Sequence, residues 1–141
     1  MSDDPFDLAR FRTAQTGVID QVLAELRAGR KQSHWMWFIF PQIEGLGLSD
    51  MARTYAITSL AEARAYLADP ELGHRLRACI EALLAHAGQP AERILGGVDA
   101  LKLRSCLTLF GAAAPNDQLF QRALDVFFGG EADAATLERL D

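Results

Sequence analysis

The sequence predicts an all-α protein: a single compact domain, residues 1–141, in which seven to nine mostly short helices surround a central aromatic-rich helix. Apolar residues recur three and four positions apart through most of the chain, which is the spacing of amphipathic helices. No stretch alternates apolar and polar residues for long enough to indicate a sheet. No internal repeat or low-complexity segment divides the 141 residues, a length that suits one domain.

The N-terminal third predicts two helices. Apolar residues from Phe6 onward indicate a first helix, with Gly17 as a point where it divides and Gly29 as its C-terminal cap. The central helix follows at 33–42, with Ser33 as its N-cap and Pro41 ending it. It contains both tryptophans of the chain. A buried strand over the same aromatic residues is the alternative, because periodicity does not distinguish the two.

Capping residues and glycine or proline breaks delimit the helices of the remaining chain. Ser59 and Glu62 have the spacing of a capping box, in which a hydroxyl and a carboxylate satisfy amide groups of the first turn. Asp117 is expected to cap a later helix in the same way. The predicted helices are 49–56, 59–67, 70–87, 90–95, 98–114, 117–128 and 134–140.

Composition narrows the function classes. The formal net charge of -5 argues against a broad nucleic-acid surface, which would be basic. The longest apolar run is too short to cross a bilayer, and the N-terminus lacks the pattern of a secretory signal, so we expect a cytoplasmic protein without membrane contact. Cys79 and Cys106 are interpreted as buried reduced thiols, with a disulfide or metal pair as the alternatives.

The segment before the aromatic run is the first candidate for chemistry. On a helix, His34 shares a face with Trp37 and Phe38, and Lys31 lies one turn earlier. A cation, an imidazole and an indole would then meet at the mouth of an apolar pocket, an arrangement that suits a flat anionic ligand. Alternatively, the indoles belong to the core and His34 only bonds a carbonyl group.

The 98–114 helix carries the second candidate. Lys102, Ser105 and Thr108 form a polar stripe with less charge than an exposed helix face usually has. The two hydroxyls therefore either line a cavity or bond back to carbonyl groups of their own helix. No familiar catalytic signature, such as a P-loop, GxGxxG, GxSxG or HExxH motif, occurs in the chain.

A resemblance to a known family rests on residues 4–8, 29–42, 45–49, 55–57, 102–103, 105 and 108–110, and the long aromatic motif within 29–42 is highly specific. On these residues the chain resembles the bacterial domain-of-unknown-function family 1810, nearly from end to end. The resemblance implies a mainly α-helical single domain and brings no established activity, cofactor or catalytic residue. The label "calpastatin" that some members carry finds no support, since no inhibitory repeat is present. Cys106 stands where the family usually has a serine.

These observations lead to a ligand-binding hypothesis with two alternatives. We expect a small anionic, nucleotide-like ligand in a pocket between the 33–42 and 98–114 helices, and no cofactor or metal. An enzyme of the hydrolase or transferase class, with His34 as acid or base, is the first alternative. A protein-interaction or homodimer module with an exposed aromatic patch is the second. The residues expected to hold, stack on or orient the ligand are Arg30, Lys31, Trp35, Trp37, Gln42, Lys102, Ser105 and Thr108.

Overall fold

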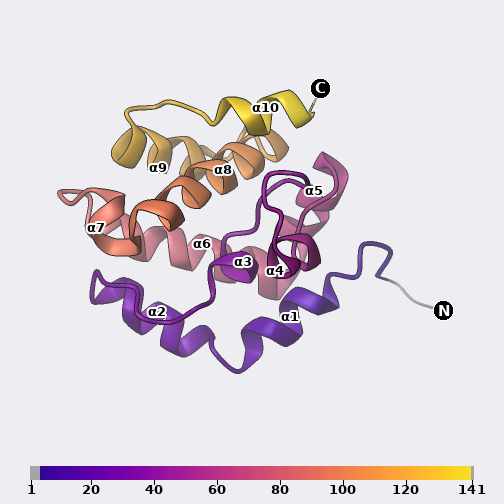
Figure 1. The fold of residues 1–141 in the computed structure, drawn as a ribbon, viewed down its shortest axis with the longest axis horizontal. Coiled ribbons are helices and arrows are strands. Elements are labelled where there is room, and N and C mark those ends of the chain that lie inside the picture. The colour runs from indigo at the N-terminus through magenta and orange to yellow at the C-terminus, as the bar shows by residue number, and fades with distance from the viewer. Residues whose placement is uncertain (1–3, 141) are drawn as a thin grey trace.

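A computed structural model describes residues 4–140; residues 1–3 and 141, the ends of the predicted domain, lie outside the described part. Within these described residues ten helices form one compact body, and α3 lies in its middle (Figure 1). Ten is one more than the sequence predicts, because the first helix is divided at Gly17. The helices are α1 (Ala9–Thr16), α2 (Ile19–Arg27), α3 (Met36–Ile39), α4 (Asp50–Thr54), α5 (Leu60–Ala68), α6 (Pro70–Leu84), α7 (Ala91–Leu95), α8 (Gly97–Ala113), α9 (Gln118–Phe128) and α10 (Ala134–Leu140).

The long helices α6 and α8 organise the packing. In Figure 1, α1 and α2 lie along one side, α6 crosses the middle, and α8, α9 and α10 follow on the other side. Helix α6 packs against α2, α5 and α9, whereas α8 packs against α5, α7, α9 and α10. Within residues 4–140 no strand forms, and the extended segments meet only in an isolated bridge between Ile43 and Ile57. No helix in this part of the chain has the length and apolar character needed to cross a membrane.

A row of aromatic rings crosses the core and joins helices that are distant in sequence. The ring of Phe11 meets that of Tyr66 edge-on at 5.1 Å, and Tyr66 meets Phe110 at 5.2 Å. Phe110 stacks on Phe120 at 6.1 Å, so the row links α1, α5, α8 and α9. The Tyr66 hydroxyl accepts a hydrogen bond from the Gln15 amide, and burial raises the pKa of this phenol. Ring pairs of this kind contribute about 0.5–1.5 kcal/mol beyond the area they bury.

The predicted helix starts are largely confirmed by their caps. The Ser59 hydroxyl accepts from the amide of Glu62, and the Asp117 carboxylate accepts from the amide of Leu119. The second half of the predicted capping box differs, since the Glu62 carboxylate accepts from the Thr58 amide, one residue earlier than expected. The close approach of α5 and α6 requires Gly73, because a Cβ there would collide with the carbonyl oxygen of Leu67.

The central helix is shorter than predicted, and the prediction of Ser33 as its N-cap is wrong. Helix α3 is one turn, Met36–Ile39, with Trp35 in the N-cap position and no side-chain cap. The Ser33 hydroxyl is bonded to the carboxylate of Glu25 instead. Residues 33 and 34 therefore precede the helix, and the expected shared helical face of His34 and Trp37 does not form.

Candidate functional site

A buried carboxylate from α2 holds the segment that leads into α3. Glu25 is 7% exposed, and one of its oxygens accepts from the amides of Gln32 and Ser33 at 2.6 and 2.9 Å and from the indole N–H of Trp35 at 3.1 Å. Its other oxygen accepts from the Ser33 hydroxyl at 2.6 Å and the Gln21 amide at 3.0 Å. Burial alone would raise the pKa of Glu25, but these donors outweigh it and lower the pKa to about 2. The carboxylate is therefore ionised and fixes the chain at 32–35.

Two lysines and an aspartate connect this segment to the first turn of α8. The ammonium group of Lys31 lies 3.0 Å from one oxygen of Asp99, and that of Lys102 lies 3.5 Å from the other. Each lysine also lies over an indole: Lys31 is 5.0 Å from a ring centroid of Trp35, and Lys102 is 5.2 Å from one of Trp37. The backbone amide of Lys31 donates to the carbonyl group of Ile94 at 2.8 Å. We call Lys31, Asp99 and Lys102 the lysine–aspartate cluster; its formal charges leave one positive charge in excess.

The two tryptophans have different environments. Trp35 is 2% exposed and belongs to the core, with its ring 6.2 Å from that of Phe40. Trp37 is only partly buried, and besides the ammonium group of Lys102 it faces a hollow. The sequence-based question of whether the indoles are core or pocket therefore has a separate answer for each residue.

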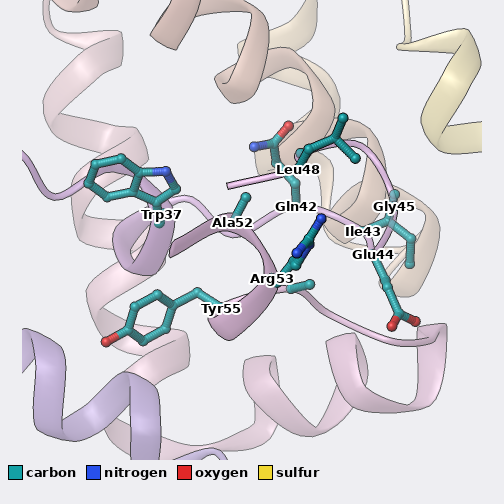
Figure 2. A pocket seen from close by; sticks show the side chains of 11 residues that line it. Trp37, Gln42, Ile43, Glu44, Gly45, Leu48, Ala52, Arg53 and Tyr55 are labelled. Carbon is teal, nitrogen blue, oxygen red and sulfur yellow. The ribbon is translucent and has the colours of Figure 1, made fainter. Parts of the chain in front are cut away.

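The hollow beside Trp37, which we call the Trp37 pocket, has a volume of about 260 Å³ (Figure 2). It lies between the end of α3, the loop at 42–48 and α4 with the residues that follow it. Two backbone hydrogen bonds pin the loop: the amide of Glu44 donates to Ile57, and the amide of Ile57 donates to Gln42. The lining residues are Trp37, Gln42, Ile43, Glu44, Gly45, Gly47, Leu48, Ala52, Arg53, Tyr55 and Ala56.

The polar side chains of the Trp37 pocket come from the loop at 42–48 and from α4 with the residue that follows it. Figure 2 shows the guanidinium group of Arg53 pointing toward Gln42 and Leu48, while the carboxylate of Glu44 points away from it. Among residues 4–140, Arg53 makes no side-chain hydrogen bond or ion pair. Arg53 thus presents a guanidinium group to the pocket that no described carboxylate neutralises.

The Trp37 pocket does not lie where the sequence predicts a pocket. The sequence places it between 33–42 and 98–114, but no residue of 98–114 lines the Trp37 pocket. The lysine–aspartate cluster and the Trp37 ring occupy the contact between α3 and the start of α8. Of the predicted ligand-binding residues, Trp37 and Gln42 line the pocket. Lys102 does not line it, but its ammonium group lies over the Trp37 ring.

Ser105 and Thr108 lie elsewhere and hold the C-terminal helix. Both bond back to carbonyl groups of α8, as in the second interpretation of the polar stripe. Ser105 also donates to the carboxylate of Asp133, and the Thr108 hydroxyl accepts from the Asp133 amide at 2.9 Å. Asp133 in turn accepts from the amide of Thr136 at the start of α10. The two hydroxyls are buried at 6% and 3% exposure and have no place at the Trp37 pocket.

Arg30 and His34 are the remaining candidates, and the structure does not bring them to the Trp37 pocket. Arg30 is exposed and borders a separate hollow beside α2. His34 is exposed, and within residues 4–140 its ring makes no hydrogen bond or ion pair. Acid–base chemistry by His34 stays a prediction, and His34 does not line the Trp37 pocket.

Three residues of the candidate site, Glu25, Asp99 and Arg53, are not among the site residues that the sequence predicts. Glu25 lies three residues after the apolar Val22, a position on the buried helix face that could have identified it. Asp99 and Lys102 have the i, i+3 spacing of a helical ion pair. Arg53 gives no comparable signal, because its partners in the pocket are brought together only by the fold.

Cys79 and Cys106 are free and buried, and burial raises the pKa of both thiols, that of Cys79 to about 12. In the described part of the chain, histidine, cysteine and acidic side chains do not gather in groups of three or more that could hold a metal ion. The side chains that line the Trp37 pocket carry indole, phenol, amide, guanidinium and carboxylate groups.

Comparison with known proteins gives a family and no activity. No curated protein matches the chain. The conserved hypothetical protein Rv1873 from Mycobacterium tuberculosis has 48% identical residues and a TM-score of 0.95; the match covers 97% of this chain and 98% of that one. A family model described as "Protein of unknown function (DUF1810)" matches residues 5–140, so the chain belongs to this family.

Proposed function

We propose that this protein binds a small anionic, nucleotide-like ligand in the Trp37 pocket. The observation that carries the proposal is that one hollow is lined both by the unneutralised guanidinium group of Arg53 and by the partly exposed indole of Trp37. An aromatic face favours a flat ring, and a guanidinium group forms paired hydrogen bonds with phosphate or carboxylate oxygens. The pocket offers both to a single molecule.

Gln42 and Tyr55 complete the recognition of the ring. Both line the pocket, and the Gln42 amide supplies one acceptor and two donors that can select among ring edges. The ring of Tyr55 is held 5.4 Å from that of Phe38 and 5.7 Å from that of Phe11. Side chains fixed before binding lose less entropy when the ligand arrives.

The lysine–aspartate cluster acts on the ligand indirectly. Asp99 neutralises one of the two ammonium groups and holds both near the indoles. Neither lysine is therefore free to bind an anion directly. Lys102 orients the Trp37 ring by a cation–π contact, and the excess positive charge of the cluster favours an anion nearby.

Calorimetric titration with AMP and ADP tests the proposal, with tryptophan emission as a second readout. Arg53→Ala should weaken binding about tenfold or more, because a hydrogen-bonded charge pair contributes about 1.5–3 kcal/mol. Gln42→Ala should weaken it less. Arg30→Ala, which removes an exposed arginine outside the pocket, is the matched control and should leave binding unchanged. Absence of binding at millimolar ligand, or equal affinity in Arg53→Ala and wild type, would contradict the proposal.

A further inference from the structure

A second hollow adjoins the Trp37 pocket on the side of the N-terminal turn. Its volume is about 440 Å³, and it lies between residues 5–7, Arg10 of α1 and the connection at 54–58. Glu44, Arg53 and Ala56 line both hollows. Arg53 thus stands at the boundary between two adjoining spaces, and we call this second space the Asp7 hollow.

The sizes of the two spaces bear on the ligand. Binding sites for small molecules usually have volumes of roughly 300–1,000 Å³. The Trp37 pocket, at about 260 Å³, falls short of this range, whereas the two spaces together fall inside it. A ligand that fills the site therefore extends beyond Arg53.

The floor of the Asp7 hollow is rigid. The guanidinium group of Arg10 donates to the carbonyl groups of Thr54 and Ala56, each at 2.8 Å, and to the carboxylate of Glu62 at 2.9 Å. Glu62, 1% exposed, also accepts from the amide and hydroxyl groups of Thr58. Arg10 and Glu62 neutralise each other and keep the hollow open without offering net charge.

The charges that remain at the rim are acidic. The carboxylates of Asp7 and Glu44 are exposed, and within residues 4–140 neither makes a hydrogen bond or ion pair. Asp7 has a φ of 52°, the one left-handed conformation of a non-glycine residue in this part of the chain. Beyond Arg53, the hollow therefore offers hydrogen-bond acceptors and repels a further anionic group.

We propose that the ligand continues past Arg53 into the Asp7 hollow with an uncharged, hydroxyl-bearing unit. The ligand class is then a phosphate-linked conjugate of a flat heteroaromatic ring and a sugar. Its ring lies at Trp37, its phosphate at Arg53, and its hydroxyl groups donate to Asp7 and Glu44. This inference rests on the proposed function and extends it.

ADP and ADP-glucose, which differ by one sugar, test the inference by calorimetric titration of the full chain at pH 7. ADP-glucose should bind about tenfold more tightly than ADP, because its sugar meets acceptors that repel a free terminal phosphate. The double substitution Asp7→Asn and Glu44→Gln should weaken ADP-glucose about tenfold and should not weaken ADP. Asparagine tolerates the left-handed conformation at position 7, and Glu44→Gln alone provides a second variant. Glu81→Gln, at an exposed site on α6, is the control.

The possible results separate the two proposals. Binding of ADP that depends on Arg53, with no gain from the sugar, would overturn the inference and leave the proposed function standing. Equal weakening of both ligands by the double substitution would also overturn the inference. No binding of either ligand to the wild-type protein would overturn both.

Discussion

Glu25→Gln is the substitution that most directly tests how the site is held together. The change keeps the shape of the side chain but removes the negative charge from a carboxylate that accepts five hydrogen bonds. A glutamine also turns one acceptor oxygen into an NH2 group, which would face donors. We expect lower stability and looser order at 32–35, the segment that leads to Trp37.

The magnitude follows from the pKa of Glu25. A fall from the ordinary value of 4.5 to about 2 corresponds to at most about 3 kcal/mol, since surrounding water screens part of the effect. A pKa that is lower in the folded state means that the stabilisation is fully present above pH 4.5. It is lost as the pH falls through the folded-state value, near 2. Between pH 7 and pH 3 the contribution of Glu25 should therefore shrink by up to about 2 kcal/mol.

Urea denaturation followed by tryptophan emission measures this contribution. The difference in free energy of unfolding between wild type and Glu25→Gln should be large at pH 7 and should narrow toward pH 3. The difference cancels the titration of every other group, and Glu81→Gln, an exposed glutamate on α6, should show little effect at either pH. A difference that stays constant from pH 7 to pH 3 would refute the reasoning, because the carboxylate would then contribute shape and no charge.

Three further outcomes follow from the packing. Thr108→Val should lower the free energy of unfolding by about 1 kcal/mol through loss of a buried hydrogen bond, while ligand affinity stays unchanged; a loss of affinity would return Thr108 to the binding site. Cys79 and Cys106 should resist Ellman's reagent at pH 8 until urea unfolds the protein, and rapid reaction in the folded state would contradict their burial. Lys102→Met should shift the indole N–H resonance of Trp37 and cost less than about 1 kcal/mol in urea denaturation, because the Lys102 side chain is 25% exposed. An unchanged resonance would show that the cation–π contact does not form.

The fold follows from signals that are local in sequence. Helix α8 is predicted at 98–114 and observed at Gly97–Ala113, because a glycine pair stands at its start and a proline follows its end. Ser59 and Asp117 cap the helices that they were expected to cap. A cap acts within one turn of its helix, so its effect can be read from neighbouring residues.

The candidate site depends on contacts that are distant in sequence, and there the prediction is incomplete. Ser33 has the residue type and position of an N-cap, but the carboxylate of Glu25, eight residues earlier, takes its hydroxyl. Ser105 looks like a cavity residue until Asp133, 28 residues later, is seen to bond it. Arg53 and Trp37 line the same pocket only because the loop at 42–48 folds between α3 and α4. The spacing of apolar residues predicts the helix face on which a residue lies. It does not predict which distant residue contacts that face.

The treatment of the two tryptophans gives the strongest reason to regard the Trp37 pocket as a functional site. A protein core needs apolar side chains that are fully buried, and Trp35 meets that need at 2% exposure. Trp37 is left partly open, yet an ammonium group, itself held by Asp99, lies over its ring. Fixing a partly exposed indole in this way adds little to stability, since exposed cation–π contacts contribute only about 0.5–1 kcal/mol. It does reduce the entropy that the indole itself would lose if a ligand stacked on it, and that reduction would favour binding.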